Sequence, residues 1–478
     1  MRLPELGLYI DGTWRGAAGR DARVQLNPSS GEPFGALPLA TDTDLDDALD
    51  AARRAFPAWR RTPAPERAAL LHRAAAILRS KADALGTLIA TELGNPLAPA
   101  KFEAMVASDV LDWSAGEARR IYGRVVPSRF PGARQLVLKE PIGPVFAACP
   151  WNMPLIFPAR KISEAIAAGC TIIIKPAEET PASAVALVRT LEEAGLPKGV
   201  VNLVFGVPDQ ISRRLLGSGA IRKLSFTGSV PVGKHLARLA ADHLVKCTLE
   251  LGGHAPTIVF DDASVEAIAP MLAERKARVS GQVCNSPTRF FVQEGVYAKF
   301  RSAFARALSA IRIGDPLAPQ TQMGPLVNER RLESIASFVS DARAKGATVV
   351  AGGARIGDQG YFHALTLVDE VPDDARVMNE EPFGPLAAMQ PFRRVEEVIE
   401  KSNRLPYGLA AYGFSASKKN LDSLAEGLDV GLLGLNHCNL AAAETPFGGV
   451  KESGYGSEGG SEGVEGYLVR KFVTEVPA

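Results

Sequence analysis

The sequence predicts an α/β fold with more than one domain. The chain has 478 residues, too many for one ordinary hydrophobic core. Short β-forming runs alternate with helical stretches over residues 144–250, which predicts a parallel sheet covered by helices. A second alternating region covers residues 256–435. We therefore expect two α/β domains, each built on its own sheet.

The residues before this alternation predict helices followed by an arm. Apolar residues recur at helical spacing after Thr43, which we expect to cap a helix, and again over residues 70–78. Residues 122–138 place prolines and a glycine among strand-forming residues, so we expect a strand pair there.

The first alternating region has the pattern of a nucleotide-binding sheet. Thr180 and Pro181 are expected to open one of its helices, and Gly195 to close it. Such sheets bind nucleotides beyond the carboxyl ends of their strands. The expected strands are 145–149, 171–174, 200–204, 223–226 and 247–249.

Composition excludes several classes of protein. The 54 Lys and Arg residues balance 53 Asp and Glu residues, so no basic excess indicates a nucleic-acid partner. No long apolar run predicts a membrane span, and the N-terminus lacks the apolar core of a secretory signal. The five cysteines show no CxxC spacing, so we expect reduced thiols, no metal site and a cytoplasmic location.

Two side chains carry the chemistry that the sequence predicts. Cys284 follows Gly281-Gln282-Val283, and Glu250 precedes a Gly-Gly turn at the end of an expected strand. A thiolate can attack a carbonyl carbon, and a carboxylate can activate water. Together these two groups can make and hydrolyse a thioester.

Further motifs follow one another in a fixed order around these two residues. They are Pro150-Trp151-Asn152-Met153-Pro154, Lys175-Pro176-Ala177-Glu178-Glu179-Thr180-Pro181, Phe226-Thr227-Gly228-Ser229 with Gly233, Glu250-Leu251-Gly252-Gly253, Gly281-Gln282-Val283-Cys284, Glu380-Glu381-Pro382-Phe383-Gly384-Pro385 and Pro446-Phe447-Gly448-Gly449-Val450-Lys451. In this set and order the chain resembles the aldehyde dehydrogenase superfamily. The pocket residues are most similar to those of succinate-semialdehyde dehydrogenases.

The resemblance implies a role for each catalytic candidate. Cys284 would be the nucleophile, and Asn152 would hold the oxyanion together with the backbone N–H of that cysteine. Glu250 would activate the water that hydrolyses the thioester. Lys161 and Glu458 would relay protons away from it.

The resemblance also implies a nicotinamide cofactor. Gly228, Ser229 and Gly233 would let a helix N-terminus approach the pyrophosphate. Lys175 and Glu178 would hold the adenine-side ribose, and a carboxylate there would repel a 2′-phosphate, so we expect NAD with NADP as the alternative. The remaining cofactor residues are Trp151 and Leu251, with Glu381 and Phe383 at the nicotinamide ribose.

Two arginines indicate the substrate. Arg160 and Arg278 occupy positions at which succinate-semialdehyde dehydrogenases carry arginine, and a guanidinium fork suits a carboxylate. We therefore expect a carboxyl-bearing semialdehyde. Ser286 replaces a second cysteine usual in those enzymes, and residues 441–443 are alanines where a serine is usual. Glutarate or 2-oxoglutarate semialdehyde, and broad specificity for uncharged aldehydes, therefore stay open.

The resemblance divides the chain into three parts. A Rossmann-like NAD-binding domain would comprise residues 1–121 and 139–251, and an α/β catalytic domain residues 252–454. A small β oligomerisation arm would comprise residues 122–138 and 455–478. The arm would pair subunits into a homodimer or homotetramer. The small-molecule aldehyde is the other partner, with neither nucleic acid nor membrane expected.

Two other functions compete with this interpretation. Cys284 could serve a hydrolase if His254 or His437 acted as its base. The chain could also be a catalytically silent protein that only binds. The presence of Cys284, Glu250 and Asn152 together argues against silence. Ser457, in place of the arginine usual there, has no functional account.

Overall fold

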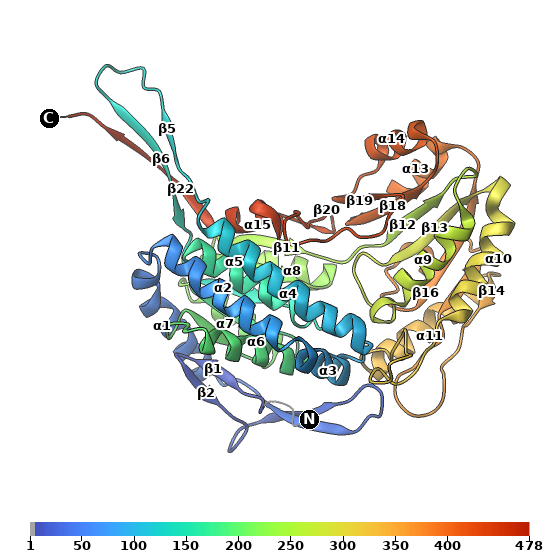
Figure 1. Ribbon diagram of the computed structural model, residues 1–478, viewed down its shortest axis with the longest axis horizontal. Helices are drawn as coiled ribbons and strands as arrows, with labels where there is room; N and C mark the ends of the chain where they lie inside the picture. The colour runs from blue at the N-terminus through green and yellow to red at the C-terminus, as the bar shows by residue number, and fades with distance from the viewer. Residues whose placement is uncertain (1–4, 478) are drawn as a thin grey trace.

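The computed structural model describes residues 5–477, which form two large sheets and a projecting arm (Figure 1). Met1 to Pro4 and Ala478, assigned above to the first domain and the arm, lie outside the described residues. The mixed α/β class expected from the sequence is confirmed. None of the described helices is long and apolar enough to cross a membrane.

The first sheet has eight strands in the order β2-β1-β9-β8-β7-β10-β11-β21. Its five central strands are parallel, and these are the five strands expected from the sequence. Most of their residues are buried because helices cover both faces of a parallel sheet, although β10 and β11 carry polar side chains among the apolar ones. The bounds are β1 (Leu8–Ile10), β2 (Thr13–Arg15), β7 (Val145–Ala148), β8 (Ile172–Lys175), β9 (Val201–Leu203), β10 (Lys223–Thr227), β11 (Lys246–Glu250) and β21 (Gly454–Tyr455).

The first helix packed on this sheet begins at a different cap from the one expected. The first helix is capped by Thr41, not Thr43: Thr41 Oγ1 accepts from the Asp44 backbone N–H, and the Asp44 carboxylate accepts from the Thr41 backbone N–H. Thr43 therefore lies inside the first turn. The helices are α1 (Asp42–Trp59), α2 (Ala64–Ser80), α3 (Ala82–Leu93), α4 (Leu97–Ala118), α5 (Ile156–Ala168), α6 (Pro181–Glu193), α7 (Pro208–Gly217), α8 (Val230–Ala241) and α15 (Gly460–Glu465).

Helix α6 begins at Pro181 as expected, but the Thr180 side chain does not cap it. The Thr180 hydroxyl donates instead to the Trp151 carbonyl at 3.1 Å. The cap comes from α3, because the buried Glu92 carboxylate accepts from the backbone N–H groups of Ala182 and Ser183. A contact between distant segments thus replaces the local one.

The second sheet has seven strands in the order β14-β15-β16-β13-β12-β18-β19, parallel except at the β14 edge. Its helices flank it on the right of Figure 1. The strands are β12 (Ala255–Val259), β13 (Pro287–Gln293), β14 (Thr348–Ala351), β15 (Thr366–Asp369), β16 (Leu386–Phe392), β18 (Ala410–Phe414) and β19 (Leu432–Leu435). The helices are α9 (Val265–Ala277), the 3₁₀ helix η1 (Arg278–Gly281), α10 (Glu294–Ala310), α11 (Glu329–Ala344), α12 (Arg376–Asn379), α13 (Val395–Asn403) and α14 (Lys418–Gly427).

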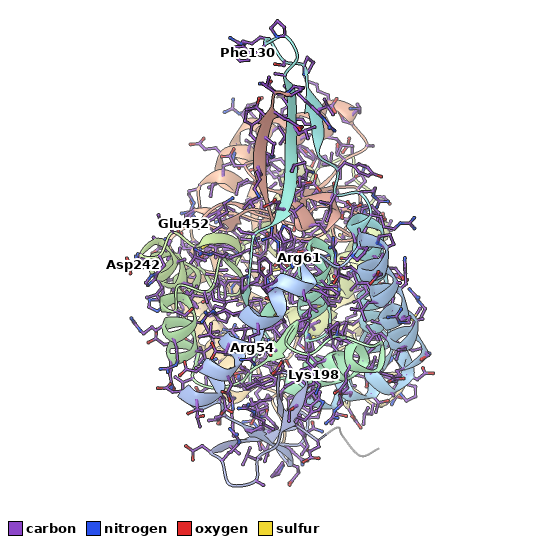
Figure 2. The ribbon with its side chains drawn as sticks, turned by 90° about the vertical axis from the view of Figure 1, so that its left-hand side faces the viewer. Arg54, Arg61, Phe130, Lys198, Asp242 and Glu452 are labelled. Carbon is purple, nitrogen blue, oxygen red and sulfur yellow. The ribbon has the colours of Figure 1, made fainter. Side chains whose placement is uncertain are left out.

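The arm is a three-stranded antiparallel sheet that projects from the body (Figures 1 and 2). It comprises β5 (Arg124–Val126), β6 (Arg134–Pro141) and β22 (Leu468–Glu475). The expected strand pair is present, although β6 continues past residue 138 because β22 pairs along its whole length. Phe130 lies at the tip, and Val125 and Phe472 are exposed on the strands.

The chain returns from the second sheet to the first through residues 436–455. Here β20 (Val450–Lys451) pairs with β17 (Tyr407–Gly408), and β21 pairs with β11 at the edge of the first sheet. The boundary proposed between residues 454 and 455 falls inside β21. The remaining hairpin, β3 (Ala22–Leu26) and β4 (Pro33–Pro38), belongs to neither large sheet.

Gly454 makes this return possible. It pairs with Glu250, its φ is +122°, and a Cβ at this position would overlap the Leu249 carbonyl oxygen. We expect Gly454→Ala to lower stability by about 1–2 kcal/mol for backbone strain and about 1–3 kcal/mol for overpacking. Gly132→Ala is the control, because Gly132 also has a positive φ, of +76°, but nothing lies near its Cβ position. Melting temperatures that fall equally in both variants would contradict the steric argument.

Candidate active site

A cavity of about 620 Å³ lies at the carboxyl end of the first sheet, against the turn that carries Cys284. Most of the residues selected from the sequence line it: Trp151, Asn152, Lys175, Glu178, Gly228, Ser229, Glu250, Leu251, Cys284, Glu381 and Phe383. Lys161, Glu458, Gly233, Arg160 and Arg278 are not part of this lining.

The turn before Cys284 has an unusual backbone. Val279 and Ser280 have φ values of +48° and +55°, in the left-handed region that side chains rarely adopt. The Ser280 hydroxyl holds the turn by bonding to the Gly324 carbonyl at 2.8 Å. At Gly281 a Cβ would overlap the Gly384 carbonyl, so the nucleophile turn packs directly on the loop that follows Glu381 and Phe383.

The Cys284 thiol is partly buried and held in its neutral form. Burial raises its pKa to about 12, with Glu381 and Glu250 acting in the same direction and Arg275 opposing them. A thiolate is the nucleophile in thiol chemistry. The resting site therefore needs a base close to the thiol.

Asn152 lies beside the Cys284 turn. Its Nδ2 donates to the Gln282 carbonyl at 2.9 Å, so one amide hydrogen ties it to the turn and the second is not used there. The side chain is buried, at 1 % exposed, which fixes the position of its amide. This is the arrangement that a preorganised oxyanion donor requires.

Glu250 ends β11 and is buried with neither carboxylate oxygen hydrogen-bonded to a described residue. Burial and the charge of Glu458 raise its pKa well above the ordinary value, while Lys161 and Arg160 oppose the rise. A carboxylate with a raised pKa accepts protons more readily near neutral pH than an ordinary glutamate does. It can take a proton from either a thiol or a water.

Lys161 and Glu458 form a buried ion pair, and Ser225 bridges them. Burial works against the charge of Lys161, but Glu458 raises its pKa above the ordinary value. Neither residue contacts Glu250 directly; they act on it through charge. Glu164, which the sequence did not single out, accepts from the Gly459 backbone N–H at 2.7 Å and adds a third buried carboxylate to this group.

The other end of the cavity has polar groups suited to a dinucleotide. Ser229 is the N-cap residue of α8, so the unpaired backbone N–H groups of that helix start at the cavity. Lys175 Nζ pairs with the Glu178 carboxylate at 2.6 Å, and Glu178 also accepts from the Gly206 backbone N–H. A Cβ at Gly233 would overlap Leu251, so this glycine permits close packing of α8 rather than lining the cavity.

Two aromatic rings and a carboxylate form the wall between that end and Cys284. Trp151 and Phe383 meet edge to face, with ring centroids 5.5 Å apart. Glu381 accepts from the Gly253 backbone N–H at 3.2 Å, and burial raises its pKa to about 8. These groups offer both a polar and an apolar surface, which fits a ribose and an aromatic ring.

The charge of Arg160 acts on Glu250 and that of Cys284 on Arg278, and neither arginine forms an ion pair with a described residue. Within the described chain no carboxylate is within 4.0 Å of either guanidinium. Arg160 is 3 % exposed, its Nη2 is 3.5 Å from the Ala442 carbonyl and its Nε has no hydrogen-bond partner. Burial and the charge of Arg275 lower the pKa of Arg278 to about 10, while the charge of the buried Glu103 opposes the fall.

Two further cations near the site were not found from the sequence. Arg331 donates to the carbonyl groups of Pro382 and Phe383, which fixes the left-handed Phe383 at φ +45°. Arg275 donates to Asn285, the residue after the nucleophile. Neither arginine belongs to a local motif, and only the proximity of Arg275 to Arg278 in the chain could have drawn attention to it.

The histidines do not support a cysteine–histidine pair. His254 is buried, and its two ring nitrogens lie 2.7 Å from Thr288 Oγ1 and 2.9 Å from the Val377 carbonyl. His437 is exposed and accepts from the Asn439 backbone N–H. In the part of the chain that the structure describes, neither histidine hydrogen-bonds to Cys284.

Known proteins are similar to this chain over nearly its whole length. The family model described as the aldehyde dehydrogenase family matches residues 14–473. The 4-(hydroxymethyl)benzenesulfonate dehydrogenase of Comamonas testosteroni is 47% identical over 99% of this chain and 98% of its own. An NADP⁺ succinate-semialdehyde dehydrogenase of Escherichia coli is 39% identical over 99% of both chains. Betaine aldehyde dehydrogenase of Staphylococcus aureus, a point mutant solved with NAD⁺, superposes with a TM-score of 0.96 at 32% identity, covering 99% of this chain and 97% of that one.

The protonated resting thiol is open to test by alkylation. The rate of alkylation follows the fraction of the thiol that is ionised. A thiol with the ordinary pKa of 9.0 is mostly ionised above pH 9.0, whereas the raised pKa of Cys284 moves its ionisation to higher pH. We expect inactivation of the cofactor-free protein by iodoacetamide to keep accelerating as the pH passes 9.0. Labelling of Cys284→Ala measures the other thiols and is subtracted. A plateau below pH 9.0 would show that the thiol is activated at rest.

Proposed function

Because this chain belongs to the aldehyde dehydrogenase family, we propose that it oxidises an aldehyde with an anionic far end to the acid, using NAD⁺ or alternatively NADP⁺. Carboxyl-bearing semialdehydes are one such class. The observation that carries the anionic choice is the pair of arginines, Arg160 and Arg278, near Cys284 and Glu250 without carboxylate partners. A buried guanidinium lacking an acidic partner favours an anionic ligand.

The first step forms a carbon–sulfur bond. Glu250 removes the Cys284 proton, and the sulfur electron pair attacks the aldehyde carbon while the carbonyl π electrons move to oxygen. Asn152 Nδ2 and the Cys284 backbone N–H stabilise the resulting oxyanion. The raised pKa of Glu250 suits it to accept the proton, and the product is a thiohemiacetal on Cys284.

Hydride loss then gives the thioester. Gly228 and Ser229 would hold the cofactor pyrophosphate at the start of α8, Lys175 and Glu178 the adenine-side ribose, and Glu381 the other ribose. The bound cofactor supplies the hydride acceptor. Glu178 is already paired with Lys175, which offsets its repulsion of a 2′-phosphate, so both NAD⁺ and NADP⁺ fit this proposal.

Hydrolysis releases the acid. Glu250 takes a proton from water, the water oxygen adds to the thioester carbon, and the carbon–sulfur bond breaks to return the Cys284 thiolate. The buried Lys161–Glu458 pair beside Glu250 provides groups that can carry the proton onward. Glu250 thus acts twice in one turnover.

The two roles of Glu250 separate kinetically. Cys284→Ala should abolish NADH formation from any aldehyde, because no thiohemiacetal can form. Glu250→Gln should slow thioester hydrolysis most, so rapid-mixing kinetics should show a burst of NADH followed by turnover at least about 100-fold slower than that of the unaltered protein. Unchanged turnover in Glu250→Gln would remove this residue from the mechanism.

The arginines should act on the anionic end of the substrate. For Arg160→Gln and Arg278→Gln we expect kcat/KM for succinate semialdehyde to fall by roughly tenfold to hundredfold, mainly through KM, because a charge-assisted hydrogen bond is lost. Propanal is the neutral control. An equal loss with propanal would favour a broad-specificity enzyme for uncharged aldehydes and overturn the anion-binding proposal.

A further inference from the structure

We propose that Arg275 is a further specificity-determining residue, which selects aldehydes whose far end is a sulfonate. This inference rests on the anion-binding function proposed above and names the anion. A sulfonate has three oxygens, and Arg275 would supply the third guanidinium beside Arg160 and Arg278.

Arg275 is anchored next to the nucleophile. It lies in the last turn of α9, and its Nη2 is 2.8 Å from Asn285 Oδ1 and 3.5 Å from the Tyr412 hydroxyl. Tyr412 in turn donates to the Asn285 carbonyl at 2.6 Å. Since Asn285 directly follows Cys284, these contacts fix the guanidinium beside the catalytic turn.

The partners of Arg275 are all neutral. Throughout the described residues no carboxylate lies within 4.0 Å of its guanidinium, although the side chain is partly buried. Its charge also acts on Arg278, whose pKa it lowers, and on the Cys284 and Cys438 thiols, whose rise in pKa it opposes. The buried Glu103 offsets only part of the repulsion that Arg278 receives from Arg275, so an anion that joins the two guanidinium groups would be favoured.

Arg289, in the same α/β part of the chain, is an arginine with a purely structural role and can be compared with Arg275. Its guanidinium is buried and donates to the carbonyl groups of His254, Lys401 and Ser402, which occupy its three nitrogens. In Arg275 only Nη2 donates to described residues. Most of the donors of Arg275 therefore stay available for a ligand.

The chain segment between β19 and β20 links two of the three arginines, Arg160 and Arg275. Arg160 contacts this segment at the Ala442 carbonyl and lies over the Phe447 ring, 5.5 Å from its centroid. Arg275 acts on Cys438 of the same segment, which packs in one apolar cluster with Tyr412 and Phe447. The alanines at 441–443 bring no side-chain hydrogen-bond group of their own, so these three positions cannot recognise an anion through their side chains.

Three donor groups discriminate between anions by geometry. A carboxylate presents two oxygens in one plane, and one or two guanidinium groups satisfy it. A sulfonate presents three oxygens in a pyramid, and each can accept from a different guanidinium. Loss of the third guanidinium should therefore weaken recognition of a sulfonate more than that of a carboxylate.

The test compares aldehydes that differ only at the far end: 4-formylbenzenesulfonate, 4-formylbenzoate and benzaldehyde. We expect Arg275→Gln to lower the ratio of kcat/KM for the sulfonate to that for benzaldehyde by roughly tenfold to hundredfold. The same ratio for the carboxylate should fall less. Because these are ratios, any general loss of activity cancels.

A second variant, Asn285→Asp, keeps Arg275 but gives its guanidinium a carboxylate partner. Asn285→Asp puts a carboxylate where the amide oxygen lies 2.8 Å from the guanidinium, so the sulfonate ratio should fall as it does in Arg275→Gln. Arg275→Lys, which keeps the charge but not the fork, should retain part of the ratio. Circular dichroism and melting curves identify a variant that fails to fold. The ratios of the remaining variants among Arg275→Gln, Asn285→Asp and Arg275→Lys then test the role of Arg275.

The outcomes separate the two proposals. If the unaltered protein favours neither anionic aldehyde over benzaldehyde, the anion-binding function fails and this inference fails with it. If that preference exists and falls in Arg160→Gln or Arg278→Gln, but all ratios stay constant in the Arg275 and Asn285 variants, only the role of Arg275 is overturned. An equal fall for sulfonate and carboxylate would keep Arg275 as an anion contact and refute selection of the sulfonate.

Discussion

Close approach of the loops around Cys284 and Glu250 is the constraint on which the site depends. A Cβ at Gly253 would come within 3.0 Å of the Cys284 carbonyl, and one at Gly281 would overlap the Gly384 carbonyl. At Gly448 a Cβ would lie 3.3 Å from the Glu250 carboxylate. Glycines therefore permit the loops that carry the nucleophile, the base and the returning chain to meet, and Cys284 and Glu250 consequently line one cavity.

The same close packing determines the electrostatics. Excluding water penalises charge, so burial raises the pKa of the Cys284 thiol and of Glu250 and Glu381, and lowers the pKa of Lys276 to about 7. The site at rest thus favours neutral groups. Lys161 with Glu458, and Lys175 with Glu178, are exceptions, because in each pair one residue provides the opposite charge that the other requires.

Much of this architecture could be predicted because local sequence patterns determine it. The five central strands of the first sheet are short β-forming runs between helical stretches, and Asn152, Glu250 and Cys284 lie in or beside glycine- or proline-containing turns. Thr43 was the wrong cap because Thr41 and Asp44 bond reciprocally, a competition between neighbouring threonines that spacing does not resolve. The roles of the site residues stay predictions that the geometry supports.

Other features could not be predicted because they join distant segments. Glu92 of α3 caps α6, and Gly233 makes room for the Leu251 side chain rather than lining the cavity. Arg275 is placed beside the catalytic turn by its contacts with Asn285 and Tyr412. In the sequence alone, Glu92, Gly233 and Arg275 cannot be distinguished from ordinary helical residues. Such contacts depend on tertiary packing and have no periodic signal.

The position of Arg275 also links substrate binding to the chemistry at Cys284. Its positive charge favours the thiolate, and an anion bound to the guanidinium would cancel part of that effect. The thiol of a site loaded with an anionic aldehyde would then depend more strongly on a nearby base for its deprotonation. Glu250, buried within the same cavity and with its pKa raised, is suited to that task, so the group that anchors the substrate and the group that activates the nucleophile need not be the same.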